Sequence, residues 1–203
     1  MIKKVLTIIG GFLVLLLAGL YLFVDSEVYT ERSIVVDTAP QFAFDQAHIL
    51  PNWDNWSPYD DDDPTITVTY SGQASGPGAY FTWAGEKAGA GKLTITESEA
   101  PSSIKTKLEF DGQGEGYGTW SFTSEGSGTK VTWGFGADMG MSPLGKIFAL
   151  MMPGRMSTYL DKGLGDLKKA AEADVAKPIP MPAPEPESDP SSEVVPEEIE
   201  ESE

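Results

Sequence analysis

The chain has 203 residues, and its 31 acidic and 14 basic side chains give a formal net charge of −17. A strongly acidic surface repels phosphate backbones, so we expect no nucleic-acid partner. The sequence contains no cysteine, which excludes disulfides, thiol catalysis and thiolate metal sites within it.

The first element is an apolar run over residues 5–24, twenty residues without a charge. At about 1.5 Å per residue a helix of this length spans roughly 30 Å, the thickness of the bilayer hydrocarbon. Lys3 and Lys4 precede the run and Asp25 follows it. The positive-inside rule therefore predicts a single-pass anchor over residues 1–27 of the cytoplasmic (inner) membrane, with the N-terminus inside and an extracytoplasmic, periplasmic domain. A cleaved signal is the alternative, although the run is long for one and no small-x-small site follows Ala18.

The next elements are a strand over residues 31–37 and a short helix over residues 41–49, which Pro51 ends. A turn-rich segment, NWDNWSPYDDDDP, follows. From Thr65 to Phe135 apolar and polar residues alternate in six short runs separated by glycine-rich turns. Such alternation is typical of an antiparallel meander with one buried and one wet face.

The period then changes from strand to helix. Ser142 and Pro143 provide an N-cap and a first-turn proline. Apolar residues follow at helical spacing to about Ala171, and we expect Pro153-Gly154 to kink or split this helix. Because the helix is the one large amphipathic element available, we predict that it covers the sheet. The predicted fold is α+β, a helix-grip domain over residues 28–175 with a curved seven-stranded antiparallel sheet around a long C-terminal helix.

The last 28 residues, 176–203, carry seven of the fifteen prolines and nine acidic residues, and they contain no aromatic residue. Such a segment cannot bury enough apolar area to offset the entropy of ordering it. We expect a disordered acidic tail, either a solvated linker or a docking segment for a protein partner.

Six pieces of the chain carry a family pattern: ERSIVVDTAP, NWDNWSPYD, VTYSGQASGPGAYFTW, GKLTITESEAPSSI, GTKVTWGF and the C-terminal PLGKIF with LDKGLGDLK. Together they resemble the polyketide cyclase/dehydrase-like branch of the SRPBCC superfamily (START-like, birch-pollen-allergen-like), over about residues 28–172. Its most specific fragment is W-x-x-W-S-P, from Trp53 to Pro58. The resemblance implies the same helix-grip fold and an internal cavity for a hydrophobic or amphipathic small molecule, lipid-like or polyketide-like, with no shared catalytic triad.

Aromatic and methionine side chains in the inward register of the strands and on the helix are the candidate cavity lining, because together they form adaptable apolar pockets. A fully packed core is the alternative. The candidates are Trp56, Phe81, Trp83, Trp120, Phe122, Trp133, Phe135, Phe148, Met151, Met156 and Tyr159.

Polar motifs carry weaker signals. Asp60–Asp63 lack the spacing of a calcium loop, so a solvated loop is favoured over a metal site. The glycines at 112, 114, 116 and 118 precede a strand, so they indicate a sheet bend or close backbone packing and not a dinucleotide site. His48 and Glu97 are the acid–base candidates, and for both a surface or packing role is favoured. We assign no catalytic residue, metal or cofactor.

Three functions remain. The first is a membrane-tethered, extracytoplasmic binding domain for a hydrophobic or amphipathic ligand. The second is a cyclase- or dehydratase-type enzyme that moves protons with polar cavity groups. The third is a ligandless interaction domain that recruits a protein partner through its acidic tail. Because few inward polar residues are visible, the sequence favours binding over catalysis.

Overall fold

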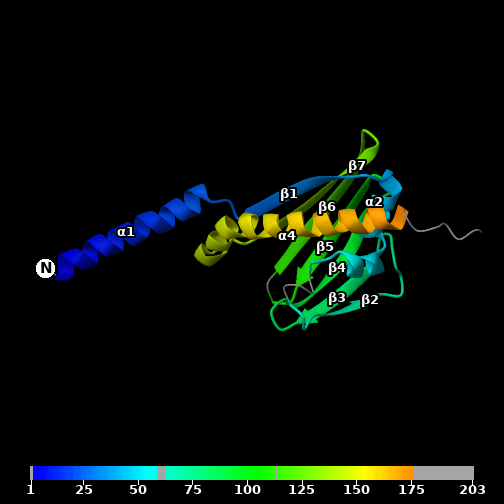
Figure 1. Ribbon diagram of the computed structural model, residues 1–203. Coiled ribbons are helices and arrows are strands. Elements are labelled where there is room, and N and C mark those ends of the chain that lie inside the picture. Colours follow the sequence, from blue (N-terminus) through cyan, green and yellow to red (C-terminus); the bar gives the residue numbers. More distant parts are fainter. Residues whose placement is uncertain (1, 59–62, 113, 176–203) are drawn as a thin grey trace, which may run out of the picture.

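The computed structural model describes residues 2–58, 63–112 and 114–175 (Figure 1). The predicted acidic tail, residues 176–203, therefore lies outside the described residues, and so do Asp60, Asp61 and Asp62. A protruding N-terminal helix is followed by a domain in which a sheet and a long helix form two layers (Figure 1).

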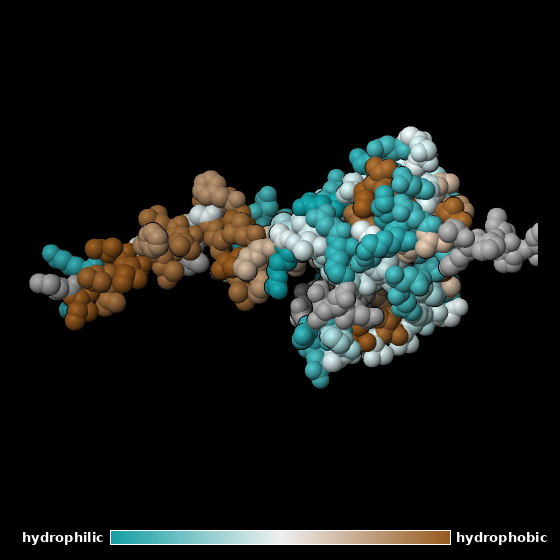
Figure 2. All heavy atoms as spheres, in the orientation of Figure 1, coloured by the Kyte–Doolittle hydropathy of each residue, from teal (hydrophilic) through white to brown (hydrophobic). Residues whose placement is uncertain are grey.

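The N-terminal helix α1, Ile2–Phe23, stands apart from the domain, with its apolar side chains exposed (Figures 1 and 2). It is long and apolar enough to cross a membrane, a property that it shares with signal sequences. The predicted apolar helix is therefore present, with its apolar side chains exposed.

Seven antiparallel strands form one sheet in the order β1-β7-β6-β5-β4-β3-β2, as predicted. The strands β2 to β7 make the meander, and β1 is added beside β7. The connection from β1 to β2, which lie at opposite edges, carries α2 (Pro40–His48) and the 3-10 helix η1 (Leu50–Asn55). The strands are β1 Glu27–Val36, β2 Thr67–Tyr70, β3 Tyr80–Gly85, β4 Gly89–Glu99, β5 Ser103–Phe110, β6 Gly114–Glu125 and β7 Gly128–Asp138.

The long helix α4, Pro143–Val175, lies across the sheet as predicted (Figure 1). It passes through Pro153 as one 33-residue helix, so the predicted split is wrong. Two hydroxyls bond carbonyls around the proline: Ser157 Oγ donates to Pro153 O at 2.6 Å and Thr158 Oγ1 to Gly154 O at 3.3 Å. Both are bonds from a hydroxyl to the carbonyl four residues earlier in the turn after the proline, whereas the helical bond that Pro153 cannot make is the one to the carbonyl of Ala149.

The two halves of α4 differ in which face is apolar. The C-terminal half buries Leu160, Leu164 and Leu167 against the domain, as expected. At about 100° per residue, Leu144 lies roughly 160° around the helix from Leu164, so an uninterrupted helix turns Leu144 away from the core. Phe148 and Met151, expected to face the sheet together with Met156 and Tyr159, are instead exposed. The exposed large apolar residues of the N-terminal half are Leu144, Ile147, Phe148, Leu150 and Met151.

The core between the layers is dominated by tryptophan. The indoles of Trp120 and Trp133 stack at 4.4 Å between ring centroids, and those of Trp53 and Trp56 meet at 4.6 Å. Trp53 Nε1 donates to Ala47 O at 2.9 Å, and Trp56 Nε1 donates to Gln46 O at 3.0 Å. The W-x-x-W fragment thus fixes α2 and η1 above the sheet.

Candidate functional site

An apolar cavity of about 190 Å³, here called the inner cavity, lies between the sheet and α4. It is enclosed by side chains from η1, strands β3 to β7 and the middle of α4. Aromatic residues predominate, and the two hydroxyl groups that line it belong to Thr106 and Tyr159. The lining residues are Trp53, Trp83, Ala88, Leu93, Thr106, Leu108, Phe110, Gly118, Trp133, Phe135, Met156, Tyr159 and Leu160.

The inner cavity owes its space to the glycine on β6 that faces it. A Cβ at Gly118 would lie 2.4 Å from Thr106 Oγ1, so a larger residue there would force the neighbouring strand side chain into the cavity. A Cβ at Gly116, two residues earlier, would lie 3.1 Å from the Phe135 ring, so this glycine allows the ring to pack closely on β6. Of the two roles predicted for this glycine stretch, a sheet bend or close backbone packing, close packing is confirmed for Gly116 and Gly118, whereas a Cβ at Gly112 or Gly114 would meet nothing within 4 Å.

A second apolar space of about 510 Å³, here called the outer groove, adjoins the inner cavity. Phe110, Phe135 and Met156 line both. The outer groove runs from these residues toward the N-terminal half of α4, where Phe148 and Met151 form part of its wall. An elongated apolar molecule in the groove would therefore have one end at the entrance to the inner cavity.

The outer groove also carries charge, contributed by Glu115, Asp138 and Arg155. Lys107 Nζ lies 2.8 Å from Glu115 and neutralises it. Asp138 accepts a bond from the backbone N–H of Gly140 at 2.9 Å, and this bond is the largest cause that lowers the pKa of the Asp138 carboxyl. Arg155 is exposed and makes no ion pair with another described residue. The groove thus presents one cation, Arg155, beside two carboxylates that have other partners.

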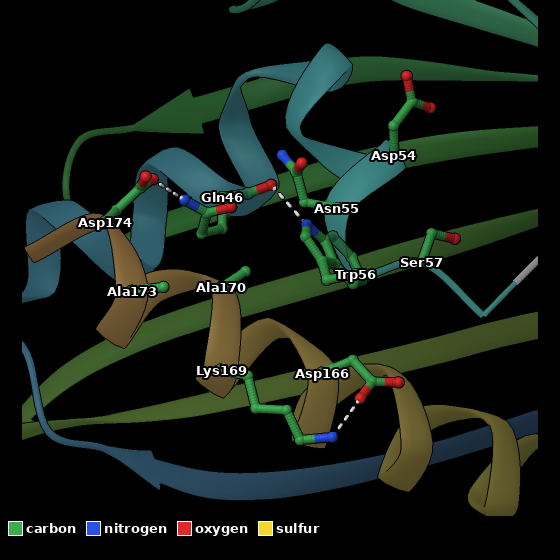
Figure 3. A pocket seen from close by; sticks show the side chains of 10 residues that line it. All are labelled: Gln46, Asp54, Asn55, Trp56, Ser57, Asp166, Lys169, Ala170, Ala173 and Asp174. Carbon is green, nitrogen blue, oxygen red and sulfur yellow. Dashed lines mark hydrogen bonds and ion pairs between the residues drawn. The ribbon is translucent and has the colours of Figure 1, made fainter. Parts of the chain in front are cut away.

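A third, polar pocket of about 520 Å³ lies at the other end of the domain, between α2, η1 and the last turns of α4 (Figure 3). Some of its polar groups pair with one another. Lys169 Nζ contacts Asp166 at 2.7 Å and lowers the pKa of that carboxyl, and Gln46 Nε2 donates to Asp174 (Figure 3). Two polar atoms of its lining, Gln46 Oε1 and Ser57 Oγ, are buried without a hydrogen-bond partner among the described residues.

The predicted lining residues divide among these spaces. Five of them, Trp83, Trp133, Phe135, Met156 and Tyr159, line the inner cavity. Phe148 and Met151 line the outer groove and are more than half exposed, at 53% and 57%. Trp56 lines the polar pocket, and Phe81, Trp120 and Phe122 lie buried in the core and line none of the three spaces.

Several lining residues were missed. Leu93, Leu108 and Phe110 share the inward register of their strands, so the alternation contained the signal, but the choice of aromatic and methionine residues passed over the leucines. Trp53 was noticed in the W-x-x-W fragment and not placed in the lining. No sequence pattern marked Arg155.

The polar candidates lie away from the inner cavity. Glu97 follows a register shift in β4 and pairs with Lys105 at 2.8 Å, with 63% of its side chain exposed. His48 lies against the ring of Phe44 at 4.7 Å between centroids, and burial lowers its pKa. The surface position favoured for Glu97 and the surface or packing role favoured for His48 agree with this geometry.

Asp63 differs from the solvated loop expected for the aspartate run, because it is buried. Its carboxylate accepts bonds from the side chain and backbone N–H of Thr65 and from the backbone N–H groups of Lys87 and Ala88 at 2.7 and 2.9 Å. The Thr65 hydroxyl and the Ala88 N–H are the main causes that hold the pKa of Asp63 well below its usual range. Since Ala88 lines the inner cavity, Asp63 fixes the turn at its edge. Among the described residues, no three acidic or histidine side chains form a metal-binding group.

Comparison with known proteins places the domain. Residues 28–172 match the family described as polyketide cyclase / dehydrase and lipid transport. No curated protein matches the chain significantly.

Among solved structures, protein SA2116 of Staphylococcus aureus is similar with a TM-score of 0.57 at 8% identity, over 74% of this chain and 97% of that one. Protein CV1439 of Chromobacterium violaceum is similar with a TM-score of 0.54 at 12% identity, over 71% and 98%. Ara h 8.0201 is similar with a TM-score of 0.50 at 14% identity, over 74% and 98%. These likenesses show the fold, and with the family match they establish that the chain belongs to the polyketide cyclase/dehydrase and lipid-transport family of the SRPBCC superfamily.

Proposed function

We propose that this protein is a membrane-tethered binding domain that holds an amphipathic small molecule outside the cytoplasmic membrane. The observation that carries the proposal is the inner cavity of about 190 Å³ with the adjoining outer groove of about 510 Å³. A dry cavity of about 150 Å³ is enough to hold benzene, and small-molecule sites have volumes of roughly 300–1,000 Å³. Together the two spaces suit an acyl chain or a fused-ring compound.

The ligand is proposed to be amphipathic because the polarity of the two spaces differs. Apart from two hydroxyls, the inner cavity presents hydrocarbon and aromatic rings. The outer groove presents Arg155, whose guanidinium binds carboxylate and phosphate in a bidentate manner. An anionic headgroup beside Arg155, with its apolar part directed past Met156 into the inner cavity, satisfies both environments.

The tether is argued from α1. Its 22 residues match the bilayer thickness and its apolar surface is exposed. Lys3 and Lys4 at one end, with Asp25 and Glu27 after the other, favour a cytoplasmic N-terminus and an extracytoplasmic domain.

Catalysis of the cyclase or dehydratase type is the second candidate, and the hydroxyls of Thr106 and Tyr159 would have to move the protons. General acid–base catalysis near neutral pH normally uses histidine or carboxylate side chains. Neither type lines the inner cavity among the described residues, which favours binding. Recruitment of a protein partner through the tail depends on residues 176–203, which lie outside the described part of the chain.

A brominated fatty acid tests the binding proposal by quenching tryptophan fluorescence in the full chain, reconstituted into phosphatidylcholine vesicles. All five tryptophans are buried in the domain, and α1 has none. Brominated fatty acid that only partitions into the bilayer therefore leaves the tryptophan fluorescence unchanged. We expect quenching that the unbrominated acid does not produce, because Trp53, Trp83 and Trp133 line the inner cavity.

Leu108→Phe, which places a ring in the inner cavity, should reduce this quenching severalfold. Leu150→Phe is the matched control, because Leu150 is exposed and lines neither the inner cavity nor the outer groove. Equal quenching of both variants would remove the inner cavity as the site. An absence of quenching in the parent chain would end the binding proposal.

A further inference from the structure

The first turns of α4 have an unusual distribution of side-chain size. Their inward face is made of Gly145, Lys146 and Ala149, all of them buried. A Cβ at Gly145 would lie 2.0 Å from Met139 O, so this face packs closely on the preceding chain. The large apolar residues point outward instead. Leu144, Ile147, Phe148 and Met151 follow the i, i+3, i+4, i+7 spacing of one helix face, and each is 44–62% exposed.

This outward face, here called the α4 apolar face, belongs to the same turns of α4 that contact the end of α1 through their inward face. Lys146 Nζ donates to the carbonyl of Val24, just after the last residue of α1, and lies 5.5 Å from the centre of the Tyr21 ring. Figure 2 shows that the brown surface of α1 continues over the atoms next to its C-terminal end, whereas the domain beyond is largely teal and white. The contact between α1 and α4 holds the turns that carry the α4 apolar face next to the end of α1.

The local charge is also unusual for this protein. The stretch from Met139 to Leu160 contains no acidic residue, and it contains the cations Lys146 and Arg155, in a chain of net charge −17. A polar or acidic partner would find no complementary side chain on the α4 apolar face itself. A bilayer edge offers hydrocarbon for the apolar residues and anionic headgroups for the exposed Arg155, whereas Lys146 is buried and bonded to Val24.

We propose that the α4 apolar face lies in the edge of the same bilayer that α1 crosses, so that the outer groove opens onto lipid. The inference rests on the tethering part of the proposed function. If α1 spans the hydrocarbon, Val24 stands at its outer boundary, and the bond from Lys146 holds the start of α4 at that depth. Phe148 and Met151 belong both to the exposed face and to the wall of the groove, so a bound molecule can pass between bilayer and protein without crossing water.

The opposite end of α4 provides an internal control. Val175 is 49% exposed and lies 31 residues beyond Leu144, roughly 46 Å along the helix at 1.5 Å per residue. Figure 1 shows α4 running away from the end of α1, so Val175 should stay in water although it resembles Leu144 in chemistry and exposure.

Single labelled cysteines test this placement, because the native chain has none to interfere. Leu144→Cys, Ile147→Cys, Val175→Cys and, inside α1, Leu13→Cys would each carry a polarity-sensitive fluorophore. The full chain would be reconstituted into vesicles of phosphatidylcholine and phosphatidylglycerol with bromines on the acyl chains. We expect quenching of the labels at 13, 144 and 147, and none at 175.

The outcomes separate the two proposals. Quenching at 13 but not at 144 and 147 would overturn the placement of the α4 apolar face and leave the tether intact. A label at 13 that is not quenched would overturn the tether itself and this inference with it. Quenching at 175 as well would mean that the whole domain lies flat on the bilayer, which also contradicts the proposal.

A kinetic measurement tests the route. The double variant Leu144→Gln, Ile147→Gln changes the α4 apolar face without altering a residue that lines the groove. Uptake of the brominated acid from the vesicle bilayer should slow severalfold, with the same final tryptophan quenching. An unchanged rate would show that the ligand reaches the groove through water.

Discussion

Replacing Gly163 by alanine should destabilise the domain, although alanine is the better helix former. Gly163 lies in the middle of α4, on the face that packs on the sheet, and it is buried. A Cβ there would lie 2.7 Å from Cζ3 of Trp133 and 3.4 Å from Cδ of Pro58. This glycine therefore sets the distance between α4 and the indole that lines the inner cavity.

The magnitude follows from two opposing effects. Alanine in place of glycine within a helix contributes about 0.5–1 kcal/mol of stability. Relieving the contact requires a shift of at least about 0.7 Å, because ordinary contact begins at 3.4 Å. Overpacking of this kind costs about 1–3 kcal/mol. Trp133 also stacks on Trp120 at 4.4 Å and cannot turn aside easily, so the expected net loss is about 1–2 kcal/mol.

Gly165→Ala is the matched control on the same helix. A Cβ at Gly165 meets nothing within 4 Å, so this variant should gain about 0.5–1 kcal/mol. Urea unfolding of the full chain in micelles, followed by tryptophan fluorescence, measures both variants, because all five tryptophans lie in the domain. The difference between the variants isolates the packing contact. A Gly163→Ala variant as stable as Gly165→Ala would refute the proposed packing of α4 on Trp133.

Three further predictions concern single side chains. Folding lowers the pKa of the Asp63 carboxyl, so its stabilising effect is present above the ordinary value of 3.8 and is lost as the pH falls toward the folded pKa. The Asp63→Asn variant should therefore be less stable than the parent at pH 7, and its free energy of unfolding, measured with urea, should decline less in acid. Arg155→Gln should weaken tryptophan quenching by a brominated fatty acid about tenfold and leave quenching by the corresponding brominated alcohol unchanged. Equal effects on the acid and the alcohol would contradict a role of Arg155 in binding the headgroup. Glu97→Gln removes an exposed pair with Lys105 and should change the free energy of unfolding by less than about 0.5 kcal/mol, so a larger loss in the same assay would show that the pair matters more than its exposure implies.

The alternation between Thr65 and Phe135 determined the strands, because a two-residue period exposes one face of a strand and buries the other. The apolar helix α1 and its length, sufficient to span a membrane, were also predictable from the sequence, because they depend on the composition of a single segment. Trp83, Trp133 and Phe135 were identified as inward-facing for the same reason. Strand positions, the apolar helix and the inward register each depend on residues close together in the sequence, so a local pattern is enough to predict them.

The orientation of the two halves of α4 depends on contacts between distant parts of the chain. The same helical spacing extends through Leu144 and Leu164, but continuity through Pro153 turns one outward and the other inward. The division of the tryptophans between a packed core and an open cavity likewise depends on where a helix from one part of the chain meets strands from another. Free space is what side chains distant in sequence leave unfilled, so no local pattern encodes it.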